Sequence, residues 1–211
     1  TEGADELCFL DIDASYENRS ATLSTVEAVA SQVFIPLTVG GGVSKLQDIE
    51  RLLEKGADKV SINTSAILDP SLVGSAAKKF GSQCIVVAVD SKREGEKSYV
   101  YTHGGKNKTA FETSAWIKIV EGEGAGEILL TSMDRDGTKI GFDNELTSSI
   151  AKDLSIPLIT SGGAGCIDHM IEGITDGKAD AVLAASIFHQ KEITIAEVKD
   201  GLASKGIEVR L

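Results

Sequence analysis

Apolar and polar positions alternate between two periods along this 211-residue chain. Short, nearly continuous apolar runs that end at a polar residue or glycine predict strands buried on both faces. Between these runs, apolar residues recur three and four positions apart, which predicts helices with one buried side. The predicted strands are 6–11, 36–39, 59–63, 84–90, 127–133, 157–160 and 181–188, and the predicted helices are 20–33, 44–56, 69–81, 114–120, 145–154, 167–176 and 195–205.

This strand–helix alternation occurs seven times with short links, which predicts a parallel sheet with helices outside it. We therefore predict an α/β fold and a single domain, 1–211, built as a (β/α)8 TIM barrel. Such barrels have eight strands. Residues 3–7 resemble residues 124–128, and a helix precedes the later copy. We expect seven of the eight βα units here, with the first strand and helix lacking; an open, doubly wound sheet is the alternative.

One segment interrupts the alternation. Residues 91–108 are mostly polar and contain the sequence Ser-Tyr-Val-Tyr at 98–101, followed by Gly104 and Gly105. We interpret this segment as a strand or hairpin inserted in a long loop, of the kind that often covers a site.

The chain also contains an internal repeat. The glycine-ended stretches that start at Pro36 and Pro157 lie 121 residues apart, and Ala-Asp-Lys-Val at 57–60 is matched by Ala-Asp-Ala-Val 122 residues later. A third pair, 9–13 and 130–136, ends in clustered aspartates. Matches in one order at nearly one spacing indicate two similar halves. Because glycine turns ahead of helices expose backbone amides, two halves predict two phosphate sites.

Composition and charge exclude several classes of function. The net charge of −11 argues against general nucleic-acid binding, so phosphate must be held by local amides and hydroxyls. No apolar run reaches the length of a membrane helix, and no signal peptide is evident. The three widely spaced cysteines favour a reduced, cytoplasmic setting. The three histidines lack metal-ligand spacing, so we expect no metal and no cofactor.

In parallel barrels the reacting groups stand where strands end. Asp90 ends a buried strand, where burial raises a carboxyl pKa, and is the clearest acid–base candidate. A loop-capping aspartate is the alternative. Asp136 is a second candidate, more suited to binding a hydroxyl. The hydroxyl of Thr64 or Ser186, with amides of the glycine turn, would bind one phosphate per half, and ordinary helix caps are the alternative. The other collected strand-end residues are Asp11, Gly40, Gly41, Gly42, Asn63, Gly137, Ser161, Gly162, Gly163 and Ala185.

With these residues collected, the chain resembles the cyclase subunits of imidazole glycerol phosphate synthase, a family of histidine biosynthesis. The resemblance covers essentially the whole chain. It is carried by Phe-Leu-Asp-Ile-Asp-Ala-Ser at 9–15, Val-Gly-Gly-Gly at 39–42, Lys-Val-Ser-Ile-Asn-Thr at 59–64, Val-Asp-Ser-Lys-Arg at 89–93, Thr-Ser-Met-Asp-Arg-Asp-Gly-Thr at 131–138, Ser-Gly-Gly-Ala-Gly at 161–165 and Ala-Ala-Ser-Ile-Phe-His at 184–189.

The resemblance implies a barrel of the ribulose-phosphate-binding type that acts on a substrate with two phosphates, a phosphoribulosyl-formimino aminoimidazole carboxamide ribonucleotide. Ammonia from a glutaminase partner passes through the barrel and yields imidazole glycerol phosphate and an aminoimidazole carboxamide ribotide. Asp90 matches one of two acid–base aspartates, and the other belongs to the first strand that we expect to be lacking. The implied phosphate ligands are Gly42, Asn63 and Thr64 in one half and Gly163, Ala185 and Ser186 in the other, with Asp136, Gly137 and Ser161 nearby.

At the opposite end of the barrel, the resemblance implies a charged ammonia gate that includes Glu6, Lys59 and Glu127. It places Asp58 on the rim where the partner docks. Two rival interpretations remain open. One is the phosphoribosyl-formimino isomerase of the same pathway, a related barrel. The other is an inactive barrel fragment. We expect open edges at 7–10 and 181–188 to favour homo-oligomers or an added segment.

Overall fold

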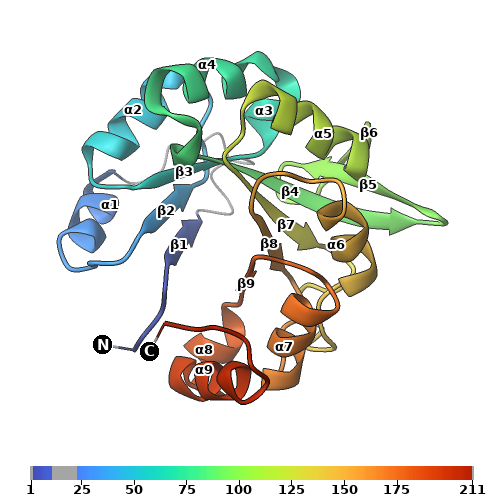
Figure 1. Cartoon of the computed structure of the whole chain (residues 1–211). Coiled ribbons are helices and arrows are strands. Elements are labelled where there is room, and N and C mark those ends of the chain that lie inside the picture. The colour runs from blue at the N-terminus through green and yellow to red at the C-terminus, as the bar shows by residue number, and fades with distance from the viewer. Residues whose placement is uncertain (1, 11–22, 211) are drawn as a thin grey trace.

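The computed structural model describes residues 2–10 and 23–210. Within these residues, parallel strands form one curved sheet in the order β1-β2-β3-β4-β7-β8-β9, with helices around its outside (Figure 1). This arrangement confirms the α/β barrel architecture. The strands are β1 (Leu7–Leu10), β2 (Leu37–Gly40), β3 (Lys59–Ile62), β4 (Ile85–Glu94), β7 (Glu127–Ser132), β8 (Leu158–Ser161) and β9 (Ala181–Leu183).

The longer helices follow the predicted order: α1 (Leu23–Ala30), α2 (Leu46–Glu54), α4 (Ser71–Phe80), α5 (Thr113–Glu123), α6 (Asn144–Ala151), α7 (Ile167–Thr175) and α9 (Ile195–Ser204). Two short helices were not predicted, α3 (Thr64–Leu68) after β3 and α8 (Ser186–His189) after β9. The predicted strand 181–188 is therefore too long, because its second half is α8. No helix in the described part of the chain has the length and apolar character needed to cross a membrane.

Alternation along the strands separates two environments. Ile85, Val87 and Val89 of β4 are fully buried in the main apolar core that the sheet shares with α1, α2, α4 and α5. Val86, Ala88 and Asp90 alternate with these residues and so point to the opposite side, into the inside of the curved sheet. Asp90 is the polar member of this inner set, and Val86 is buried.

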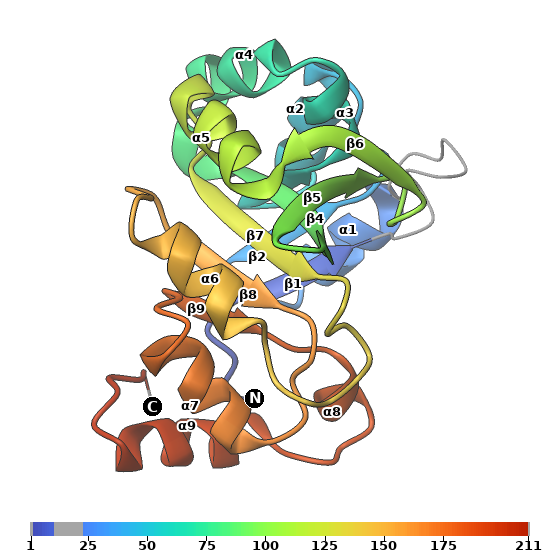
Figure 2. The ribbon, with the colours of Figure 1, turned by 90° about the vertical axis from the view of Figure 1, so that its right-hand side faces the viewer.

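The inserted segment is a hairpin, as predicted. β4 continues past Asp90 and pairs antiparallel with β5 (Lys97–Thr102), which pairs with β6 (Asn107–Glu112). Figure 2 shows these strands together on one side of the molecule, next to α5. The Trp116 side chain of α5 is fully buried, and its ring centroid lies 5.0 Å from that of Phe111 in β6. These contacts anchor the hairpin.

The internal repeat is visible in side-chain contacts. Asp58 Oδ2 accepts a hydrogen bond from the Leu37 amide at 2.8 Å, and Asp180 Oδ2 accepts one from the Leu158 amide at 2.8 Å. In return, the amides of the two aspartates donate to the carbonyls of the same leucines, at 2.9 Å each. The same bridge thus ties β2 to β3 in one half and β8 to β9 in the other.

We expect Asp58→Ala and Asp180→Ala each to lower the free energy of unfolding by about 1–3 kcal/mol, because each leaves a buried leucine amide without its acceptor. Urea unfolding of the two variants measures this. The two losses should agree within a factor of about two if the bridges are equivalent. A change below about 0.5 kcal/mol at either site would contradict the assigned role.

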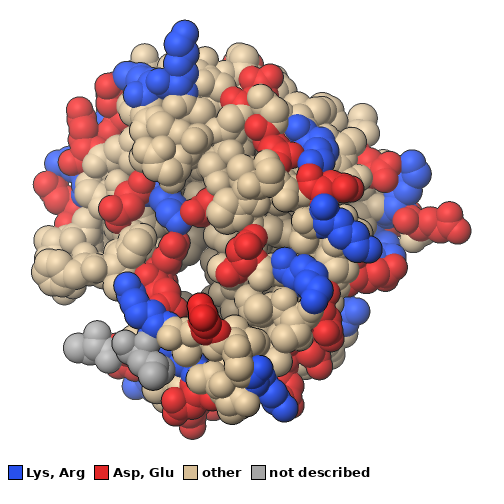
Figure 3. Space-filling model, in the orientation of Figure 1, with Lys and Arg blue, Asp and Glu red and all other residues tan. Residues whose placement is uncertain are grey.

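The sheet ends at two edges. In the described residues, β1 pairs only with β2 and β9 pairs only with β8. Leu7 and Leu10 of β1 are 36% and 38% exposed, which is high for apolar strand residues. The two edge strands flank an opening through the molecule in the space-filling view, with charged side chains around it (Figures 1 and 3). The expected open edges at 7–10 and at the start of 181–188 are therefore present.

Candidate active site

The carboxyl ends of the parallel strands lie at one edge of the sheet. The register pairs Gly40 of β2 with Ser61 of β3, and Thr131 of β7 with both Asp90 of β4 and Ser161 of β8. Both glycine turns therefore leave the sheet at the end where Asp90 stands. Asp11, another predicted site residue, lies outside the described residues.

Asp90 has the environment expected of an acid–base group. Burial raises the pKa of its carboxyl to about 6, a hydrogen bond from Asn63 opposes this rise, and the charge of Asp136 adds to it. The Asn63 Nδ2 donates to Asp90 Oδ2 at 2.9 Å. The Asn63 Oδ1 is buried and has no hydrogen-bond partner among the described residues. Since its pKa lies close to neutrality, Asp90 can both accept and donate a proton near pH 7.

In the turns that lead into α2 and α7, a side chain of each helix binds backbone amides just ahead of the first helical residue. In α2, Asp48 Oδ2 accepts hydrogen bonds from the amides of Ser44 and Lys45, at 3.0 and 3.2 Å. In α7, the equivalent position is His169, and its Nδ1 accepts from the Gly165 amide at 3.1 Å. An anion bound to these turn amides would compete with the internal acceptors.

The two short helices after β3 and β9 also start without a side-chain cap. The residues that precede α3 and α8 are Asn63 and Ala185, and neither side chain makes a capping hydrogen bond. The two residues have similar backbone φ angles, −128° and −123°. The first amides of a helix have no partner within the helix, and they favour an anion. The predicted phosphate ligands Thr64 and Ser186 are the first residues of these helices.

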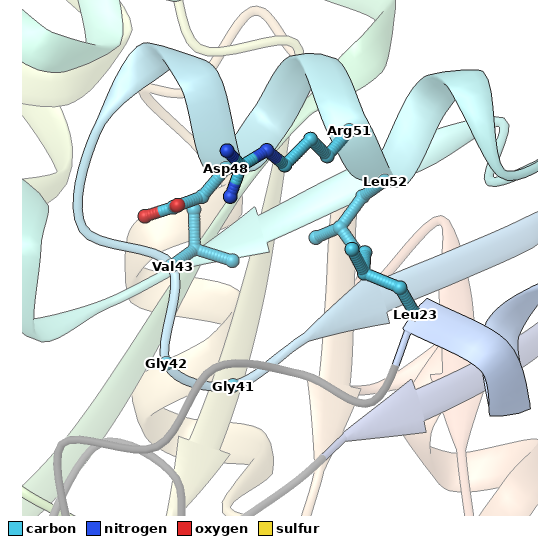
Figure 4. A pocket seen from close by; sticks show the side chains of 7 residues that line it. All are labelled: Leu23, Gly41, Gly42, Val43, Asp48, Arg51 and Leu52. Atoms are coloured by element: carbon cyan, nitrogen blue, oxygen red, sulfur yellow. The ribbon is translucent and has the colours of Figure 1, made fainter.

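The first glycine turn borders a small pocket. Gly41 and Gly42 have φ angles of 105° and 64°, which a residue with a side chain rarely adopts. Asp48 and Arg51 of α2 lie beside the turn (Figure 4). The pocket is lined by Leu23, Gly41, Gly42, Val43, Asp48, Arg51 and Leu52. Arg51 thus supplies a positive charge near the predicted ligand Gly42.

The second glycine turn is covered by a loop of the protein itself. The Gly141 amide donates to the Gly163 carbonyl at 2.8 Å, and a Cβ on Gly163 would collide with the Gly141 carbonyl. A Cβ on Gly162 would lie 2.7 Å from the Ser132 carbonyl oxygen. Close approach of two backbones therefore explains both glycines, and their role in phosphate binding stays a prediction. Asp136 and Gly137 lie exposed in the covering loop.

A charged cluster occupies the opposite end of the barrel. Lys59 Nζ lies 2.5 Å from Glu127 Oε1 and 3.0 Å from both carboxylate oxygens of Glu6. Burial lowers the pKa of Lys59, but its hydrogen bonds to Glu127 and Glu6 outweigh burial, so the pKa is raised. The structure thus brings together Glu6, Lys59 and Glu127, which were predicted as one group. Glu6 and Glu127 are 121 positions apart in the chain. Asp58 lies exposed beside Lys59 in the chain.

Sequence reasoning missed the contact between the hairpin and α3. The His103 amide, in the turn between β5 and β6, donates to Thr64 Oγ1 at 3.1 Å. His103 has a φ of 54°, and Gly104 and Gly105 have φ angles of 63° and 81°. The two adjacent glycines signal a tight turn, but no sequence feature indicates that this turn reaches Thr64.

The fold is a parallel (β/α) barrel of the TIM-barrel class. Its half-buried carboxylate, Asp90, and the starts of α3 and α8 lie at one end of the barrel. The family model described as "Histidine biosynthesis protein" matches residues 1–194, and the chain belongs to this family. Its members are enzymes of histidine biosynthesis, and the family includes both the cyclase and the isomerase. The predicted pathway is therefore confirmed.

Proposed function

We propose that this chain is the cyclase subunit of imidazole glycerol phosphate synthase, which uses ammonia from a glutaminase partner. The observation that carries this proposal is the Lys59 cluster at the amino-terminal end of the barrel. An isomerase needs one mouth for its substrate and product. A nearly buried lysine between two carboxylates at the other end suits a passage for a small polar molecule.

The carboxyl-terminal end of the barrel, where Asp90 stands, has groups suited to this reaction. The starts of α3 and α8 would each hold one phosphate of the substrate, with Thr64 and Ser186 donating their hydroxyls. Asp90, with a pKa of about 6, would remove a proton and return it as ammonia condenses with the substrate carbonyl, water leaves, the imidazole ring closes and the carbon–nitrogen bond to the ribotide breaks. The Asn63 side chain would hold the Asp90 carboxylate in place.

The second aspartate of the family lies on its first strand. We propose that the opening between β1 and β9 is where that strand belongs, because each edge has one free side. A segment that carries it, or a second copy of the chain that pairs with the edges, would cover Leu7 and Leu10. The size of the purified protein, measured by light scattering, distinguishes a homo-oligomer from a monomer.

The proposed partner surface is the amino-terminal end of the strands. Asp58 is exposed there, and Phe34, in the segment before β2, is 94% exposed. Exposed aromatic side chains are frequent anchors of protein interfaces. We also propose a cytoplasmic location, which the absence of disulfides among Cys8, Cys84 and Cys166 supports.

An assay with each of the two pathway substrates tests the function. The chain, extended by the family's first strand–helix unit, is mixed with ammonium chloride and either the phosphoribulosyl or the phosphoribosyl substrate. We expect imidazole glycerol phosphate from the phosphoribulosyl substrate only, detected by chromatography. Isomerisation of the phosphoribosyl substrate without any cyclisation would instead assign the isomerase. Absence of both activities in a folded chain would support an inactive fragment.

A further inference from the structure

The hairpin beside the mouth has one buried and one open side. Ser98, Val100 and Thr102 of β5 are buried, and β5 packs on α5. Tyr99 and Tyr101 lie between them and therefore point to the other side, where both are partly exposed. The hairpin thus presents two aromatic rings on the surface that faces away from α5.

The register places one of these rings beside the acid–base candidate. Tyr101 is paired with Asp90, and Tyr99 is paired with Lys92, in the antiparallel ladder between β5 and β4. Side chains of directly opposed residues point to the same side of the sheet, with Cβ atoms about 5 Å apart. The Tyr101 ring therefore starts next to the Asp90 carboxyl and extends along β4, out of the mouth.

The Tyr101 ring is held in position. Its hydroxyl donates to Glu94 Oε1 at 2.6 Å, and Lys108 of β6 binds the other oxygen of the same carboxylate. The Lys92 ammonium lies 5.9 Å from the centre of the ring. The hydrogen bond to Glu94 raises the pKa of the Tyr101 phenol, and the charge of Asp134 adds to the rise. A ring fixed in this way binds a flat ligand with little further loss of entropy.

Hydrogen bonds tie the hairpin to the site on both sides. On one side the His103 amide donates to the Thr64 hydroxyl. On the other side the Arg93 amide donates to Asp134 Oδ2 at 2.7 Å, at the start of the loop that carries Asp136. A ligand that reaches from α3 to this loop therefore passes Asp90 and the Tyr101 ring.

We propose that the Tyr101 ring binds the flat aminoimidazole carboxamide group of the substrate and is a specificity-determining residue of this enzyme. The proposal rests on the proposed function, because that function supplies a substrate with this heterocycle. The ring stacks on the heterocycle, and Lys92 flanks the stacked pair. The stacking holds the reacting part of the substrate above the Asp90 carboxyl.

Binding of the product ribotide tests this proposal on the 211-residue chain itself. Isothermal titration measures the Kd of aminoimidazole carboxamide ribotide and, separately, of inorganic phosphate. We expect Tyr101→Ala to weaken the ribotide about tenfold and to leave the phosphate Kd unchanged. Tyr101→Phe should retain ribotide binding within about twofold, because the ring remains. Thermal unfolding confirms that each variant is folded.

Tyr99→Ala is the matched control, since Tyr99 lies on the same face but opposite Lys92, farther from Asp90. It should change the ribotide Kd less than twofold. The proposal is overturned if Tyr101→Ala binds the ribotide as tightly as the wild type, or if Tyr99→Ala weakens it equally. Normal ribotide binding by Tyr101→Ala together with full cyclase turnover would reject the stacking role and leave the proposed function intact. Isomerase activity alone would reject the proposed function. Weaker ribotide binding by Tyr101→Ala would in that case still support stacking of the ring on the ligand.

Discussion

Asp90→Asn is expected to lower ammonia-dependent turnover by about 10³-fold or more in the chain extended by the first strand–helix unit. The substitution keeps the shape of the side chain and removes its ability to exchange a proton. KM should change little if the phosphates bind at α3 and α8, as we propose. Steady-state kinetics at saturating ammonium measures both constants. Asp176→Asn, in an exposed position after α7, is the control and should retain full activity.

The pH dependence provides a second test of Asp90. If its ionised form is required, kcat/KM should fall about tenfold per pH unit below pH 6, the pKa of the group. Stability should change in the opposite direction. The pKa is raised from 3.8 to about 6 on folding, so the native state binds the proton more tightly than the unfolded chain between these values. The ionised carboxyl thus destabilises the fold by up to about 3 kcal/mol above pH 6, and this cost disappears as the pH falls towards 4.

Asp90→Asn should therefore be at least as stable as the wild type at pH 8, and its stability should vary less between pH 4 and 6. Urea unfolding at these pH values measures the difference. An Asp90→Asn variant with retained turnover would remove Asp90 from the acid–base role. A variant with lost turnover and lost stability would assign Asp90 to the fold instead.

The order of strands and helices followed from the sequence because apolar runs and helical periods are local signals. The end of the chain shows the limit of such signals. In 184–189 the apolar residues continue without a clear period, so we predicted strand where α8 begins at Ser186. The short helix α3 was missed for the same reason. These two helices start at the predicted ligands Thr64 and Ser186, so the placement of these ligands could not be deduced from pattern alone.

In the candidate site, too, features with a local sequence signal were predicted and contacts between distant segments were not. Asp90 was found from the sequence because a carboxylate at the end of an apolar run stands out, although the strand itself was predicted too short and β4 continues to Glu94. The position of Tyr101 depends on the register of β4 and β5, and a register shift between β5 and β6 at 99–101 adds to the difficulty. The need for Gly163 was attributed to a ligand, whereas the structure places the Gly141 backbone against it. Contacts between distant segments are set by tertiary packing, which a local pattern does not contain.

The charged cluster at the other end of the barrel yields the second large effect. Lys59→Met should lower the free energy of unfolding by about 3 kcal/mol, because it leaves Glu127 nearly buried without its cation. The Lys59 and Glu127 side chains are only 14% and 15% exposed, and Glu127 Oε2 already has no hydrogen-bond partner in the described structure. Because the pKa of Lys59 is raised on folding, the stability that the pair contributes near neutral pH is lost as the pH rises through that raised pKa.

A double-mutant cycle separates the pair from simple packing. Glu127→Gln removes the charge that Lys59→Met leaves behind, so the double variant should be more stable than Lys59→Met alone, with a coupling of about 1–3 kcal/mol. The matched control is Lys55→Met, which breaks an ion pair with Glu27 whose side chains are 39% and 61% exposed. That variant should lose less than about 1 kcal/mol, because solvent screens the pair. If Lys59→Met costs no more than Lys55→Met, the cluster does not hold the amino-terminal end of the barrel together.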